Sequence, residues 1–154
     1  DVGSLCDGFY GDHAKTFCVG SVSEEKKHLL QITEECLYKG IKEAKCGNTI
    51  GDIGYAVQSN AEKNGYSVVR DLVGHGIGQK LHEEPQVPNF GLKGRGPLIK
   101  PGLCLAIEPM INFGSFEVYT KDDKWTICTK DGKPSAHFEH SIAITEKEIK
   151  ILTK

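Results

Sequence analysis

The first twelve residues constrain the fold most, because they read as a β-hairpin with a defined register. Asp7-Gly8 lies between two short strand-like runs, and Asp-Gly is typical of a two-residue hairpin turn. With the turn at that position, Gly3 faces Asp12 across the two strands. Because opposed residues share a face, Asp1 and Asp12 are predicted to be diagonal neighbours, with Cα atoms about 7–8 Å apart.

Two carboxylates on one hairpin face need an explanation. Like charges this close are unfavourable unless a cation or a shared proton relieves them. The alternative is an acidic face that is simply solvated. The hairpin therefore raises the question of whether further metal ligands lie elsewhere in the chain.

Composition narrows the classes of protein. The chain has 154 residues, 38% of them hydrophobic and 26% charged, with a net charge of −2, which suits one domain with a core and gives no sign of a nucleic-acid or membrane surface. No apolar run is long enough for a membrane span, and no signal peptide opens the sequence. The six cysteines are dispersed, which predicts reduced thiols in a cytoplasmic protein.

Two helices are predicted after the hairpin. A capping box at Ser21–Glu24 opens the first, which carries an apolar stripe at helical spacing and ends near Gly47. A second start signal at Thr49–Asp52 opens the next, which stops at Asn64-Gly65.

The rest of the chain reads as strands and loops. Residues 74–78 are too glycine-rich for a regular element, and residues 85–102 read as a long loop. Strands are predicted over 66–73, 103–110, around 125–129 and over 137–145. The order of a hairpin, two helices and then strands predicts the α+β class.

Four polar residues in this part are candidate site residues. His75 is held between glycines, and His82 follows in a charged segment. Glu108 and Glu139 each lie within or beside an apolar strand, where a buried carboxylate needs a partner or a metal. A structural histidine, or a salt bridge to one of the 19 basic residues, would explain each of them singly.

Together, Asp1, Asp12, His75, Glu108 and Glu139 form a set of carboxylates with one imidazole. An oxygen-rich set with one nitrogen suits two divalent ions such as Co, Mn, Fe(II) or Zn better than a thiolate zinc site. Two adjacent ions of this kind can activate a water for hydrolysis.

The sequence resembles the type I, bacterial-type methionine aminopeptidases of the pita-bread fold over its whole length. That fold is a curved antiparallel sheet with helices on its outer face. The matching motifs are Asp1-Val2, Gly11-Asp12, Gly74–Gly78, His82–Val87, Lys100-Pro101-Gly102, Ile107–Asn112 and Phe138-Glu139-His140.

The resemblance implies a ligand set for two divalent metal ions. Asp1 would bind one ion, Asp12 and Glu139 would bridge both, and His75 with Glu108 would bind the other. His140 is not counted as a ligand, because it should face the opposite side of its strand.

The resemblance also implies roles toward a peptide. Glu108 would take the proton of the attacking water, and His82 would lie beside the scissile carbonyl. Met110 and Trp125 would lie near the substrate pocket. Leu81 stands where the family often has an aromatic pocket residue.

The implied function is metal-dependent removal of the initiator methionine from nascent polypeptides. Residues 1–154 would form the metallo-aminopeptidase catalytic domain without its N-terminal portion, so activity of this chain alone stays open. The expected setting is the cytoplasm, with nascent chains as substrate, an association with the ribosome, and a monomeric state at full length.

Three alternatives remain. A proline-directed peptidase of the same fold usually has glycine after the buried Glu-Pro, whereas Met110 follows here. A binding module would have lost metal ligands, whereas all five positions are filled. A non-catalytic fragment, supported by a partner, is the third.

Overall fold

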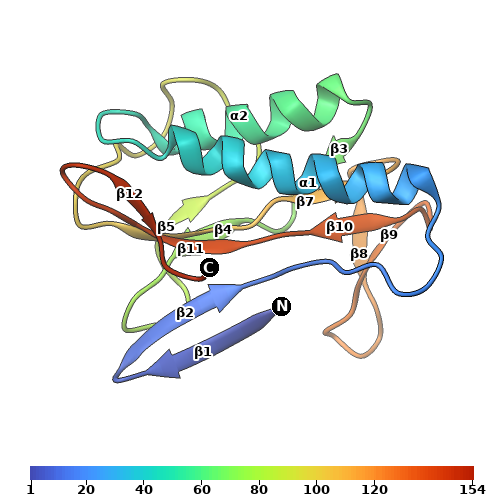
Figure 1. Ribbon diagram of the computed structural model, residues 1–154, viewed down its shortest axis with the longest axis horizontal. Helices are drawn as coiled ribbons and strands as arrows, with labels where there is room; N and C mark the ends of the chain where they lie inside the picture. Colours follow the sequence, from blue (N-terminus) through green and yellow to red (C-terminus); the bar gives the residue numbers. More distant parts are fainter.

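The computed structural model describes residues 1–154 and has two helices packed over one face of a curved β-sheet (Figure 1). The helices are α1 (Glu24–Glu43) and α2 (Ile50–Lys63). The strands are β1 (Val2–Cys6), β2 (Phe9–His13), β3 (Ser67–Val68), β4 (Gly74–Gly76), β5 (Glu83–Val87), β6 (Cys104–Ile107), β7 (Met110–Asn112), β8 (Val118–Thr120), β9 (Ile127–Thr129), β10 (Ser135–His137), β11 (His140–Ile144) and β12 (Ile149–Ile151).

The sheet has two antiparallel parts joined by strands that break and resume. Five strands follow the order β12-β11-β6-β4-β5, and three follow β10-β7-β3. The chain passes from β6 to β7 through Glu108-Pro109, and from β10 to β11 through Phe138-Glu139. Both candidate glutamates therefore lie at breaks between the two parts. The α+β class is confirmed.

The N-terminal hairpin has the predicted register. Gly3 pairs with Asp12, and Val2 pairs with His13. Asp7 and Gly8 have φ angles of 49° and 84°, the left-handed pair that a two-residue type I′ turn requires. The hairpin lies on the side of the sheet opposite the helices (Figure 1).

The two helix starts turned out differently. Thr49 and Asp52 form a reciprocal capping box at the start predicted for α2. The box predicted for α1 is wrong: the helix begins after Ser23, whose side chain makes no capping bond. The predicted end is wrong as well, since α1 stops at Glu43 and Gly47 lies in the following turn.

Several strand and loop predictions need correction. Residues 74–76, predicted to be irregular, form β4 and pair with β5 and β6, because glycine lets neighbouring strands approach closely. The predicted loop over 85–102 begins inside β5. The predicted strand over 103–110 is split at Glu108-Pro109, because proline cannot donate a ladder hydrogen bond.

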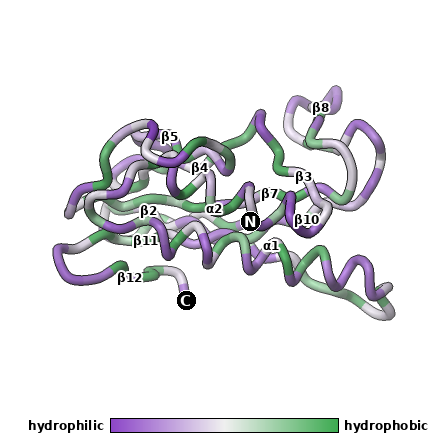
Figure 2. The backbone as a smooth tube through the Cα atoms, turned by 90° about the horizontal axis from the view of Figure 1, so that it is seen from above, coloured by the Kyte–Doolittle hydropathy of each residue, from purple (hydrophilic) through white to green (hydrophobic).

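The core lies between the helices and the sheet. One buried cluster includes Leu37, Ile53, Leu105 and Ile107, and a second joins α1 and α2 to β7 and β10. The tube of α1 alternates between hydrophobic and hydrophilic stretches, as expected for a helix with one covered face (Figure 2). Neither helix is long and apolar enough to cross a membrane. All six cysteines are free.

Candidate metal centre

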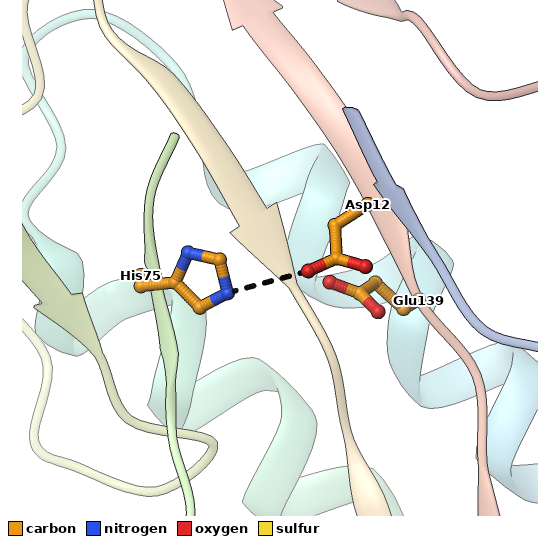
Figure 3. A group of neighbouring side chains, drawn as sticks. All are labelled: Asp12, His75 and Glu139. Atoms are coloured by element: carbon orange, nitrogen blue, oxygen red, sulfur yellow. Dashed lines mark ion pairs between the residues drawn. The ribbon is translucent and has the colours of Figure 1, made fainter. Parts of the chain in front are cut away.

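Asp12, His75 and Glu139 point toward one another from three different elements (Figure 3). One potential ligand atom from each lies within 4.8 Å of those from the others. Asp12 comes from β2, His75 from β4, and Glu139 from the break between β10 and β11. All three residues are buried. A buried position is unfavourable for two carboxylates that have no counter-charge.

The imidazole of His75 is oriented by its neighbour. Its Nδ1 lies 2.9 Å from the carbonyl oxygen of Gly76, which can only accept a hydrogen bond. In the neutral ring this leaves the lone pair on Nε2, which is 3.8 Å from Asp12 Oδ2 and 3.4 Å from Glu108 Oε1. A lone pair facing two carboxylates is the arrangement that a bound cation satisfies.

Glu139 also lacks a partner for one of its polar atoms. Its Oε1 is buried and has no hydrogen-bond partner. Burial first, and then the charges of Glu108 and Asp12, raise the pKa of Glu139 to about 9. By contrast, Oδ1 of Asp12 accepts the His13 backbone N–H at 3.1 Å. The site therefore holds a buried carboxyl group without a partner, and a divalent cation would stabilise its ionised form, so these residues fit such a cation.

Glu108 lies at the edge of this group, between two imidazoles. In addition to the His75 contact, its Oε2 is 3.6 Å from Nε2 of His137, a nitrogen that is buried and has no hydrogen-bond partner. Sequence analysis missed His137. The signal was present, because His137 is two residues before Glu139 and residues at that spacing share a strand face.

A cavity of about 1090 Å³ opens beside the three buried residues. Among the residues predicted from the sequence, it is lined by Asp1, His75, His82, Glu108, Met110 and Trp125. Asp1 is exposed and lies outside the group formed by Asp12, His75 and Glu139. Leu81 does not line the cavity, and its side chain lies beside Gly3 of the hairpin.

His82 and His140 differ in their relation to the centre. The ring of His82 meets that of His75 edge-on, with centroids 4.4 Å apart, so His82 borders the group. His140 instead stacks on His13 at 4.9 Å, and its Nδ1 lies 3.0 Å from Thr153 Oγ1. Its exclusion from the ligand set agrees with these contacts.

A buried carboxylate and imidazole centre beside a cavity is compatible with several metalloenzyme families, and sequence comparison distinguishes them. The sequence model of metallopeptidase family M24 matches residues 1–146. The chain belongs to this family. Residues 1–154 of this M24 protein are 53% identical to methionine aminopeptidase 1 of Bacillus subtilis, covering 100% of the chain and 62% of that relative.

Solved structures of methionine aminopeptidases have the same fold as this chain. The methionine aminopeptidase of Thermotoga maritima matches with a TM-score of 0.96 at 47% identity, over 99% of this chain and 61% of that one. The enzyme of Rickettsia prowazekii matches with a TM-score of 0.98 at 44% identity, over 100% and 62%. The M24 chain has the pita-bread fold and spans about three fifths of the length of these relatives.

The raised pKa of Glu139 predicts how stability depends on pH without metal. The folded protein holds a proton on Glu139 up to about pH 9, whereas the unfolded chain releases it near pH 4.5. Between these values the unfolded state binds fewer protons, so the free energy of unfolding is expected to fall with rising pH, by about 1.4 kcal/mol per pH unit. Below pH 4.5 this contribution is fully present.

Urea denaturation in chelator at pH 5, 7 and 9 measures this slope. Glu139→Gln removes the titrating group, so the difference between wild type and this variant isolates its contribution from that of the histidines. Added divalent metal is expected to recover most of the loss at pH 9, because a cation stabilises the ionised carboxylate. Equal pH slopes in the two proteins would contradict the prediction.

Proposed function

We propose that the protein removes the N-terminal, initiator methionine from nascent polypeptides by metal-dependent hydrolysis. The observation that carries this proposal is the convergence of Asp12, His75 and Glu139 beside a large cavity that His75 lines. The high identity of the chain to methionine aminopeptidases from several bacteria supports the choice of substrate. The proposal places the reaction in the cytoplasm, on chains leaving the ribosome, and expects a monomer.

The proposed cofactor is a pair of divalent ions from the set Co, Mn, Fe(II) and Zn. Asp12 and Glu139 would be shared between the ions, Asp1 would serve one of them, and His75 with Glu108 would serve the other. When bound, such ions supply Lewis acidity and lower the pKa of water. The unpartnered Oε1 of Glu139 and the Nε2 of His75, which faces the carboxylates of Asp12 and Glu108, support these assignments.

The remaining chemistry belongs to side chains at the cavity wall. Glu108 faces the cavity and is proposed to take the proton of the attacking water. His82 borders both the cavity and His75, and is proposed to donate a hydrogen bond to the scissile carbonyl as negative charge develops there. Met110 and Trp125 add apolar surface, where a methionine side chain can lose its contact with water.

Metal removal tests the proposal directly. The full-length protein, stripped by a chelator and dialysed, is expected to release no methionine from Met-Ala-Ser, and titration with Mn²⁺ or Co²⁺ should restore release. A Leu-Ala-Ser peptide is the matched control for specificity. Methionine release that persists without metal would refute the proposal, and so would equal cleavage of the two peptides.

A further inference from the structure

The segment that carries Asp12 is joined to the segment that carries Glu139 by a short ladder of hydrogen bonds, which involve both backbone and side-chain groups. Residues 12–16 continue from β2 and run beside residues 137–141. The Glu139 N–H donates to the carbonyl of Ala14 at 2.8 Å, and His13 Nδ1 lies 2.6 Å from the Glu139 carbonyl oxygen. These bonds fix the middle of the ladder, and side-chain hydroxyls close its two ends.

At one end, the hydroxyl of Ser141 satisfies both backbone groups of Asp12. Ser141 Oγ accepts the Asp12 N–H at 2.9 Å and donates to the Asp12 carbonyl at 2.8 Å. Ser141 is 1% exposed and Asp12 is 7% exposed, so water does not compete for these bonds. Asp12 itself belongs to the buried group with His75 and Glu139.

The position of this hydroxyl is itself fixed. The Ser141 N–H donates to Thr153 Oγ1 at 3.1 Å, and its carbonyl accepts the Leu152 N–H at 2.8 Å. Ser141 also pairs with Ala106 across β11 and β6. The hydroxyl is therefore carried by a strand held on both sides, whereas β2 is an edge of the small hairpin.

We propose that Ser141 is a positioning residue for the metal centre: its hydroxyl holds the backbone of Asp12 so that the Asp12 carboxylate stays in reach of Glu139 and His75. The inference rests on the proposed function, since it assigns the purpose of this bond to metal binding. Loss of the hydroxyl would leave a buried N–H and a buried carbonyl unpaired, which β2 can relieve only by moving away from β11. Displacement of β2 would move the Asp12 carboxylate away from Glu139 and His75.

Thr16 provides a matched control at the other end of the ladder. Its Oγ1 makes the same pair of bonds with the backbone of His137, accepting the N–H at 3.0 Å and donating to the carbonyl at 2.8 Å. His137 is not part of the buried group of three. Removing this hydroxyl costs a comparable pair of bonds without releasing Asp12.

The experiment compares Ser141→Ala, Ser141→Cys, Ser141→Thr and Thr16→Val in the full-length protein. Calorimetric titration of the metal-free proteins with Mn²⁺ gives the affinity, and thermal unfolding in chelator gives the stability of each. Ser141→Ala is expected to weaken Mn²⁺ binding about 10- to 100-fold, as is usual for groups that orient a ligand. Ser141→Thr keeps a hydroxyl and should restore most of the affinity, whereas Thr16→Val should lower the melting temperature with a much smaller loss of affinity.

The outcomes separate this inference from the proposed function. If wild type binds Mn²⁺ and Ser141→Ala binds it equally well, the inference is overturned while the proposed function stands. Equal losses of affinity in Ser141→Ala and Thr16→Val would overturn it too, because that pattern reports general destabilisation. If wild type takes up no Mn²⁺, the proposed function fails and the inference with it. Should Ser141→Ala not fold, Ser141→Cys decides, because a thiol keeps the volume but bonds weakly.

Discussion

Glu108→Gln in the full-length protein is expected to lower turnover of a methionyl peptide by about 10³-fold, within the range attributed to a general base. The substitution keeps the volume of the side chain, so the fold should persist. A glutamine amide cannot take a proton from water, and its oxygen is a weaker ligand than a carboxylate. The carboxylate of Glu108 lies between His75 and His137 and faces the cavity, where both losses matter.

His82→Ala is the graded comparison for Glu108→Gln. It removes one hydrogen-bond donor at the cavity wall and is expected to cost about 10²–10³-fold, less than the loss of the base. Turnover should be measured at saturating peptide, with the metal content of each variant determined in parallel, so that lost chemistry is distinguished from lost metal. Near-wild-type rates in both variants would refute the roles assigned to them.

Gly76→Ala is expected to destabilise the protein by about 3 kcal/mol, the upper part of the usual range for overpacking. A Cβ at this position would lie 2.2 Å from the carbonyl oxygen of Glu84, and 3.0 Å from that of Glu83. These are backbone atoms of β5, so they cannot move aside as the end of a flexible side chain can. The carbonyl of Gly76 also orients His75, so Mn²⁺ affinity should fall together with stability.

Gly11→Ala is the control for that experiment. A Cβ at Gly11 would meet its nearest neighbour, the Oγ of Ser4, at 3.5 Å, which is ordinary contact. Urea denaturation of the metal-free variants gives the two free energies of unfolding. A cost at Gly76 no larger than that at Gly11 would show that β4 and β5 can separate without penalty.

The elements that depend on near neighbours were predictable from the sequence. The hairpin register follows from the Asp7-Gly8 turn, and the start of α2 follows from the exchange of bonds between Thr49 and Asp52. Both rest on contacts within a few residues, which the sequence displays directly. The failure at β4 has the opposite cause, because pairing with β5 and β6 decided it.

The candidate site was likewise predictable only in part from the sequence. Sequence indicated which carboxylates were anomalous, since Glu108 and Glu139 stand within apolar surroundings. Sheet pairing across distant strands decided which groups meet: it brought Asp12, His75 and Glu139 together, kept Asp1 at the exposed rim, and added His137 beside Glu108. No local pattern encodes such distances, because they are set by the register between strands far apart in the chain.

The contact between the Ser141 hydroxyl and Asp12 could not be predicted from the sequence. A serine inside a strand has no distinctive pattern, and its partner Asp12 lies 129 positions away along the chain. Sequence by itself determined the hairpin, the second helix, the α+β class and the residue types suited to a divalent metal. Tertiary structure alone decided their convergence, because burial next to other strands turns separate polar residues into one centre with an unpartnered carboxyl group.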